Sequence, residues 1–210
     1  EGRGKDGNLI FKGRNLLWSP SFSFPLGDQR RSGFLAPTFS VNSRTGLQVL
    51  SPYYFNIAPN RDFTLYNRLM TRNGLQVGGW YRYLEPNYYG DMRFELNPHD
   101  RVVGESRYFY SVAHTFTNAL GWSGGLNVRG VSDDNYFVDY SSSILNSALR
   151  NLPREVYAGR GFGDWSVMIR ATRYQNILDA RLAPAYERVP QITANYAKFD
   201  QKGFDFTTLV

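Results

Sequence analysis

The chain has 210 residues, a formal net charge of +6 and no cysteine, and aromatic residues make up 16% of it. Its mean hydropathy is -0.44 and no run of about 18 apolar residues occurs, which excludes a transmembrane helix. The lack of thiols excludes disulfides, Cys-ligated zinc, iron–sulfur clusters and cysteine nucleophiles from these residues. The wealth of aromatic side chains favours strands.

The first residues, EGRGKDGNLIF, have none of the three regions of a signal peptide. We therefore expect either an intracellular chain or an interior segment of a longer precursor. Twenty of the 24 basic residues are arginine. Guanidinium groups suit phosphate and carboxylate partners, so an anionic ligand is one interpretation, and ordinary solvation or pairing is the other.

The first clear strand pair flanks residues 71–74, TRNG, whose Asn-Gly step is a strong hairpin signal. Alternation of apolar and polar residues then continues through residues 90–96, 107–116, 121–131, 165–175 and 192–199. The pattern predicts about eight to ten strands of about 8 to 11 residues. Residues 140–152 could form one or two helical turns within a loop.

Alternation alone fits both a soluble β-sandwich and a membrane β-barrel. Arg, Asp, Glu and Asn occupy strand centres, as a water-filled lumen allows, and Tyr and Trp gather at strand ends, as in an interfacial girdle. Both features favour the barrel.

Three blocks in the first part of the chain carry a family resemblance: FPLGDQRRSGFLAP (residues 24–37), SPYYFNIAPNRDFTL (51–65) and GLQVGGWYRYL (74–84). Together they resemble the start of the barrel in the LptD (OstA/Imp) family, the outer-membrane lipopolysaccharide assembly proteins of Gram-negative bacteria. The motif residues are Arg30, Arg31, Ser32, Gly33, Phe34, Pro52, Tyr53, Tyr54, Asn56, Pro59 and Asn60.

The resemblance implies an all-β fold, an antiparallel segment of a larger transmembrane β-barrel that would form an open curved sheet with bare edges. Residues 1–19 would be the end of a periplasmic jellyroll and its junction. Residues 20–210 would be the N-terminal part of the barrel. The family's stapling cysteines would lie outside such a segment.

The resemblance also implies transport rather than catalysis, with no cofactor, catalytic residue or metal. Such a protein inserts lipopolysaccharide into the outer leaflet of the outer membrane through a lateral gate. The implied partners are lipopolysaccharide, a plug lipoprotein (LptE-like) in the lumen, a periplasmic bridge protein (LptA-like) and the outer membrane, with no nucleic acid. Two alternatives stay open: another outer-membrane barrel, either a porin or a plugged receptor, and a soluble anion-binding β-protein.

Prolines suggest how a gate could open, because proline donates no backbone hydrogen bond and weakens a strand ladder. Pro20, Pro25 and Pro37 are expected in the first two barrel strands and are therefore the lateral-gate candidates. Each lost bond contributes about 0.5 to 1.5 kcal/mol. The alternative is that these prolines only mark turns and strand ends.

Arginines on the polar faces form a second candidate set: Arg68, Arg82, Arg93 and Arg129. They could line a path for phosphorylated sugar or pair with Asp62, Asp91 and Glu95, and we expect pairing for most of them. Arg30 and Arg31 are expected in a turn beside Asp28, where they either meet lipid phosphates or cap the turn.

Residues 51–62, SPYYFNIAPNRD, are interpreted as a strand end, a bend and a strand start near the periplasmic rim. Tyr53, Tyr54 and Phe55 would pack at an interface, and Asn56 and Asn60 would satisfy backbone groups at the bend.

An enzymatic interpretation finds little support. Ser111 and His114 would point to opposite faces of one strand, so they cannot form a catalytic couple.

Overall fold

The computed structural model describes residues 2–11, 13–24, 30–140, 151–177, 187–201 and 204–209. Two antiparallel sheets account for most of this part of the chain, which confirms the predicted all-β class. The elements are β1 (Gly2–Phe11), β2 (Arg14–Phe24), β3 (Gly33–Phe34), β4 (Thr38–Asn42), β5 (Gly46–Ala58), β6 (Arg61–Met70), β7 (Gly74–Leu84), β8 (Tyr88–Asn97), β9 (Arg107–Thr117), β10 (Trp122–Val131), α1 (Tyr136–Tyr140), β11 (Asn151–Phe162), β12 (Trp165–Asn176), β13 (Arg188–Gln201) and β14 (Phe204–Leu209).

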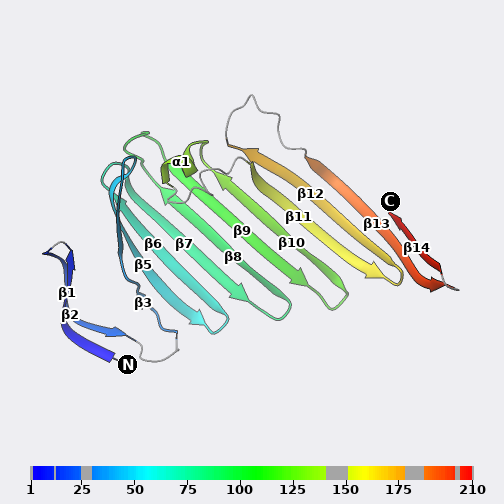
Figure 1. The fold of residues 1–210 in the computed structure, drawn as a ribbon, viewed down its shortest axis with the longest axis horizontal. Helices are drawn as coiled ribbons and strands as arrows, with labels where there is room; N and C mark the ends of the chain where they lie inside the picture. The colour runs from blue at the N-terminus through cyan, green and yellow to red at the C-terminus, as the bar shows by residue number, and fades with distance from the viewer. Residues whose placement is uncertain are drawn as a thin grey trace.

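The larger sheet has 12 strands, and from β5 to β14 each strand pairs with its neighbours in sequence (Figure 1). Both β3 and β4 pair with β5, so these two short strands form one edge and β14 forms the other. The sheet has two strands more than the eight to ten expected, and the short strands β3 and β4 account for the difference.

The two ends of the larger sheet differ in their connections. Turns of two to four residues join β5 to β6, β7 to β8, β9 to β10 and β11 to β12 at the end we call the short-turn end. The opposite, loop end carries the three-residue turn between β6 and β7 and two longer connections, residues 98–106 and the one between β10 and β11, of which residues 132–140 are described (Figure 1). Short turns at one end and long loops at the other are typical of outer-membrane barrels, in which the short turns are periplasmic.

The two faces of this sheet also differ. Met92, Val112 and Val128 lie in one cross-strand row, and the neighbouring row of the opposite face contains Asp91, Ala113 and Asn127. We call the apolar face the outer face. The polar face, against which α1 packs through Phe109, is the inner face.

Residues 51–62 contain the predicted strand end, bend and strand start, and their place near the periplasmic rim stays a prediction. Strand β5 continues through Pro52 to Ala58, and only Pro59 and Asn60 form the turn before β6. A proline is tolerated within this strand because its missing donor faces the weakly paired edge, as described below.

The hydrophobic core is small and lies at the loop end. It consists of Met70, Val131, Tyr136, Phe137, Tyr140, Leu152 and Ile177, with Phe109 packed against it. Three of these residues belong to α1, so the loop between β10 and β11 provides much of the core. This helix ends where the expected helical turns of residues 140–152 would begin, and residues 141–150 lie outside the described residues. Among the described residues, no helix has the length and apolar character needed to cross a membrane.

Strands β1 and β2 form a separate two-stranded sheet that reaches Phe24. It therefore extends past the predicted boundary between residues 19 and 20. Assignment of residues 1–19 to a jellyroll stays a prediction.

The contrast between the two faces can be tested with adjacent residues of β9. We expect Val112→Arg, on the outer face, to destabilise the folded protein by about 2 to 4 kcal/mol if lipid contacts that face. Ala113→Arg is the matched control, because Ala113 lies opposite Asp91 on the polar inner face. Urea unfolding of the full-length protein in lipid vesicles measures both, and equal losses of stability would contradict the assignment of the faces.

Candidate functional site

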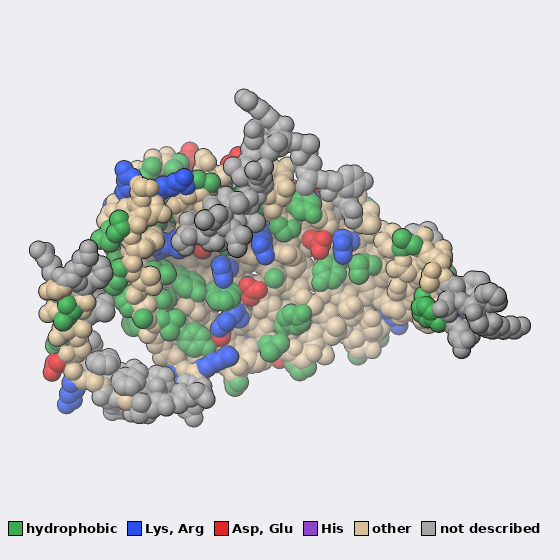
Figure 2. All heavy atoms as spheres, viewed as in Figure 1, with side chains coloured by type: hydrophobic (Ala, Val, Ile, Leu, Met, Phe, Trp, Pro, Cys, Tyr) green, Lys and Arg blue, Asp and Glu red, His purple; other side chains and the backbone are tan. Residues whose placement is uncertain are grey.

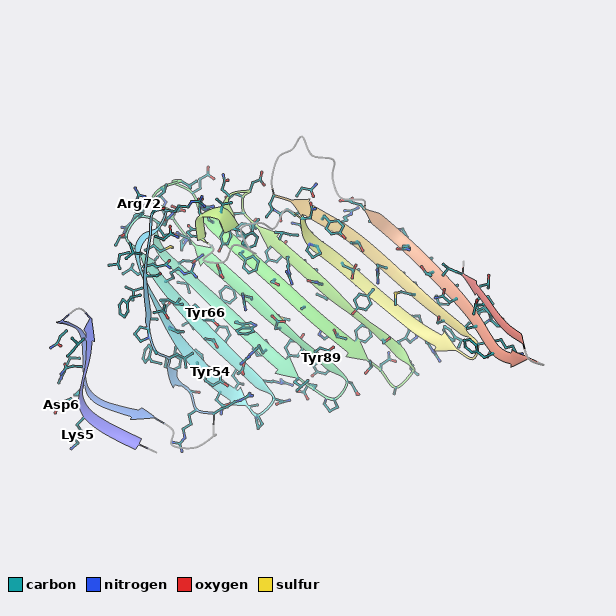
Figure 3. The ribbon with its side chains drawn as sticks, viewed as in Figure 1. Lys5, Asp6, Tyr54, Tyr66, Arg72 and Tyr89 are labelled. Atoms are coloured by element: carbon teal, nitrogen blue, oxygen red, sulfur yellow. The ribbon has the colours of Figure 1, made fainter. Side chains whose placement is uncertain are left out.

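The inner face carries charged side chains from several strands, and Figure 2 shows basic and acidic groups close together across the middle of the face it displays. Near the short-turn end, Asp62 of β6 lies directly opposite Arg82 of β7. Arg82 donates to both carboxylate oxygens of Asp62, at 2.8 and 2.7 Å. Tyr54 donates to the same carboxylate at 3.2 Å, and Arg30 lies 3.5 Å from it (Figure 3 labels Tyr54). One buried carboxylate therefore organises two guanidinium groups.

Trp80 lies between two arginines on the same face. The guanidinium carbons of Arg82 and Arg93 are 4.5 and 4.7 Å from the centre of its indole ring. The indole nitrogen donates to Asp91 at 3.1 Å, which fixes the orientation of the ring. Stacked aromatic and guanidinium groups of this kind present flat surfaces and hydrogen-bond donors to the lumen side.

Among the residues that the structure describes, the predicted pairing with a strand carboxylate is found for one of the four inner arginines. Arg82 pairs with Asp62, whereas Arg68 donates to the backbone oxygen of Tyr140 at 3.3 Å. Arg93 contacts Trp80. Arg129 has a buried Nε without a hydrogen-bond partner among the described residues.

The carboxylates expected to pair with these arginines have other partners. Glu95 accepts hydrogen bonds from Tyr136 at 2.8 Å and from Gln76 at 3.3 Å. A cavity of about 230 Å³ lies beside these groups, lined by Leu50, Tyr66, Arg68, Gln76, Gly78, Arg93 and Glu95.

A buried ionic network at the loop end was missed by the sequence reasoning. Arg107, which is 2% exposed, contacts Asp100 at 3.1 Å, Asp133 at 2.7 Å and Asp139 at 3.0 Å. Tyr140 donates to Asp100 at 2.6 Å. The network joins strand β9, the loop before it and the loop that contains α1.

These contacts fasten the α1 loop across the inner face. Besides the Arg107 network, Arg44 in the β4–β5 turn donates to the backbone oxygen of Val138. Arg68 of β6 and Asn97 of β8 both bond to Tyr140. The loop therefore links the edge strands to β8 and β9 at the loop end of the sheet.

The electrostatics of Asp100 reflect this network. Burial alone would raise the pKa of Asp100, but hydrogen bonds from Tyr140, Asn73, the Val102 backbone and Arg107 hold this pKa at about 2. Burial and the bond to Asp100 raise the pKa of Tyr140, so its phenol stays protonated and donates.

The family-motif residues pair with one another. Gly33 and Phe34 lie opposite Tyr54 and Tyr53. The Asn56 backbone N–H donates to the Ser32 hydroxyl at 2.8 Å.

The side-chain amide of Asn56 donates to a backbone group, the Arg30 carbonyl, at 2.9 Å. Asn60 donates to the Glu85 side chain at 2.7 Å instead. Arg31 is exposed, and Asp28 lies outside the described residues.

The gate candidates lie in different places. Pro20 belongs to β2 in the two-stranded sheet, outside the larger sheet, and its role at a gate stays a prediction. Pro25 lies outside the described residues. Pro37 lies between β3 and β4, at the edge of the larger sheet.

The two histidines form no catalytic arrangement in the described part of the chain. His114 faces outward, 2.6 Å from the Tyr83 hydroxyl, while Ser111 lies in the inward row with Arg93, as predicted. The described residues also contain no group of three His, Cys, Asp or Glu side chains that could hold a metal ion.

Acid should release the Asp100 network. Because the folded pKa is depressed below the usual 3.8, its stabilisation is present above about pH 4 and is lost as the pH falls towards 2. We expect Asp100→Asn to cost about 2 kcal/mol at neutral pH and the difference from wild type to shrink over that window. Unfolding of the full-length protein at pH 7, 4 and 2.5 measures this, and a difference independent of pH would contradict it.

Comparison with known proteins identifies the family. The LptD model, described as LPS transport system D, matches residues 105–209. LPS-assembly protein LptD of Ralstonia nicotianae is 44% identical over 206 residues, which are 97% of this chain and 25% of that protein. The proteins of the same name from Cupriavidus necator and Bordetella pertussis are 44% and 38% identical, over 95% and 98% of this chain and 24% and 26% of their own lengths. The chain spans about a quarter of the length of these relatives. It belongs to the LptD family of Gram-negative outer-membrane proteins.

Proposed function

We propose that the full-length protein inserts lipopolysaccharide into the outer leaflet of the outer membrane through a lateral gate, and that this chain forms one side of the gate. The names of the relatives, LPS-assembly protein LptD, support the substrate. The process is transport, so it requires no catalytic residue. The observation that supports a gate at this place is the weak pairing at the β3/β4 edge.

Only two residues of β3 and five of β4 pair with β5, and residues 35–37 interrupt the edge. The Leu35 N–H donates to the Pro52 carbonyl at 2.9 Å, so the carbonyl of Pro52 points towards this edge. In an antiparallel strand, the N–H and C=O of one residue point to the same neighbour. The donor that Pro52 lacks is therefore missing from the edge ladder.

Pro37 removes a second donor from the interrupted edge segment. Each missing bond contributes about 0.5 to 1.5 kcal/mol, so the edge is held less firmly than the longer β5–β6 ladder. Pro37 and Pro52 are therefore the gate residues in this proposal.

The inner face would form the wall along which the sugar moves. Arg30, Arg82 and Arg93 offer guanidinium groups along this wall. The Arg30 side chain is 61% exposed, whereas that of its ion-pair partner Asp62 is 4% exposed. A plug lipoprotein (LptE-like) would fill the lumen, where β10–β13 present a cavity of about 460 Å³ with small and polar lining residues such as Ser123, Ser166 and Thr193. A periplasmic bridge protein (LptA-like) would dock at the periplasmic side.

Depletion of the full-length protein tests the function. We expect newly made lipopolysaccharide to accumulate at the inner membrane while its surface amount falls, as measured by labelling of surface lipopolysaccharide in fractionated cells. Unchanged surface lipopolysaccharide together with reduced uptake of small solutes would instead support a porin.

Substitution of the edge prolines tests the gate. Pro37→Ala and Pro52→Ala each restore a backbone donor, so we expect a tighter edge and less surface lipopolysaccharide at an equal protein level. Pro86→Ala is the matched control, because Pro86 lies in the β7–β8 turn, away from the β3/β4 edge. Export equal to wild type in the Pro37 and Pro52 variants would overturn the gate.

A further inference from the structure

Two arginines face each other on the outer face of the sheet. Arg154 of β11 and Arg173 of β12 are direct cross-strand partners. Arg154 also lies opposite Val128, which is opposite Val112, so the register places both arginines on the outer face. Both residues are exposed.

Like charges directly opposite each other destabilise a strand pair unless something neutralises them. Arg154 donates to the Gln175 side chain at 3.0 Å, which leaves its charge uncompensated. Glu155 faces inward, where it contacts Thr172 and Arg170.

Glu187 lies just before the start of β13, whose first residue, Arg188, is the cross-strand partner of Thr172. Within the described ranges, neither Arg154 nor Arg173 has an ion pair with Glu187 or with any other acidic residue. The pair thus presents two positive charges to whatever contacts the outer face.

The position of the arginine pair along the strands matches the level of a lipid headgroup. Arg154 lies eight residues from Phe162, the end of β11 at the short-turn end. At about 3.3 Å per residue and a tilt of about 40°, this is about 20 Å, close to the upper limit of an apolar band about 25 Å tall. Towards the short-turn end, the same face exposes Val156 and Ile169, at 55% and 42%. Charge above an apolar surface matches a phosphorylated headgroup above acyl chains.

We propose that Arg154 and Arg173 bind a phosphate group of a lipopolysaccharide molecule in the outer leaflet, with its acyl chains along Val156 and Ile169. Paired guanidinium forks bind phosphate oxygens through charge-assisted hydrogen bonds. The inference rests on the proposed function in one respect, that lipopolysaccharide is the lipid of this leaflet. Strands β11 and β12 are far along the sheet from the β3/β4 edge, so the site holds lipid that has already left the gate.

The test uses the full-length protein with its lumenal partner in phospholipid nanodiscs. The probes are lipid A with both phosphates and dephosphorylated lipid A, and native mass spectrometry measures the bound lipid. We expect the double variant Arg154→Gln, Arg173→Gln to bind phosphorylated lipid A about tenfold more weakly and dephosphorylated lipid A unchanged. Arg160→Gln is the matched control, because Arg160 lies on the same face of β11 near the short-turn end and should bind as wild type does.

Equal binding of the two lipids by wild type, or equal losses in the double variant and the Arg160 control, would overturn the site. The double lysine variant keeps both charges and should retain most of the binding, which separates lost charge from misfolding. Excess inorganic phosphate should not displace the lipid, and complete displacement would show a phosphate site without lipid contacts. Surface lipopolysaccharide in depleted cells is measured separately, so failure of the transport proposal is distinguishable from failure of this site.

Discussion

The period of two along every strand is the constraint on which the rest of the structure depends. Once the hydrogen-bonded register of each neighbouring strand pair from β5 to β13 is fixed, the paired residues are assigned to the apolar outer face or the polar inner face. A slip of one residue in any pair would place apolar side chains in the lumen and charges against lipid. The register therefore aligns Asp62 with Arg82 inside and Arg154 with Arg173 outside.

Much of the sheet could be predicted because hairpin information is local. The Asn73-Gly74 step and the alternation beside it fix β6 and β7, and similar patterns identify β8, β9 and β10. The path of strand β5 was harder to predict, because it contains Pro52, and proline is normally confined to edges, strand starts and bulges. Whether a proline ends a strand depends on which neighbour its missing donor would face, and this is known only once the sheet is assembled.

The functional surface was predictable to a smaller extent. Direct cross-strand partners such as Asp62 and Arg82 follow from a hairpin register, so their pairing could be expected. The Arg107 network could not, because Asp133 and Tyr140 arrive through a loop whose path alternation does not encode. The same loop provides the partner of Arg68, one of the four arginines for which strand carboxylates were the expected partners in most cases. Arg107 is buried and contacts three carboxylates. A movement of this loop would separate Arg107 from some of these carboxylates and leave uncompensated charge, so it would cost free energy.

The interruption at residues 35–37 also decides which face of the sheet the side chains of the edge strands point to. Phe34 pairs with Tyr53 and Phe39 with Val49, so the edge segment contains one residue more than the stretch of β5 that it covers. In a regular strand, Phe34 and Phe39, five positions apart, would point to opposite faces. With the extra residue, both point outward. A shift of the edge segment by one residue along β5 would turn both phenylalanines to the polar inner face, so the extra residue favours a single register at this edge.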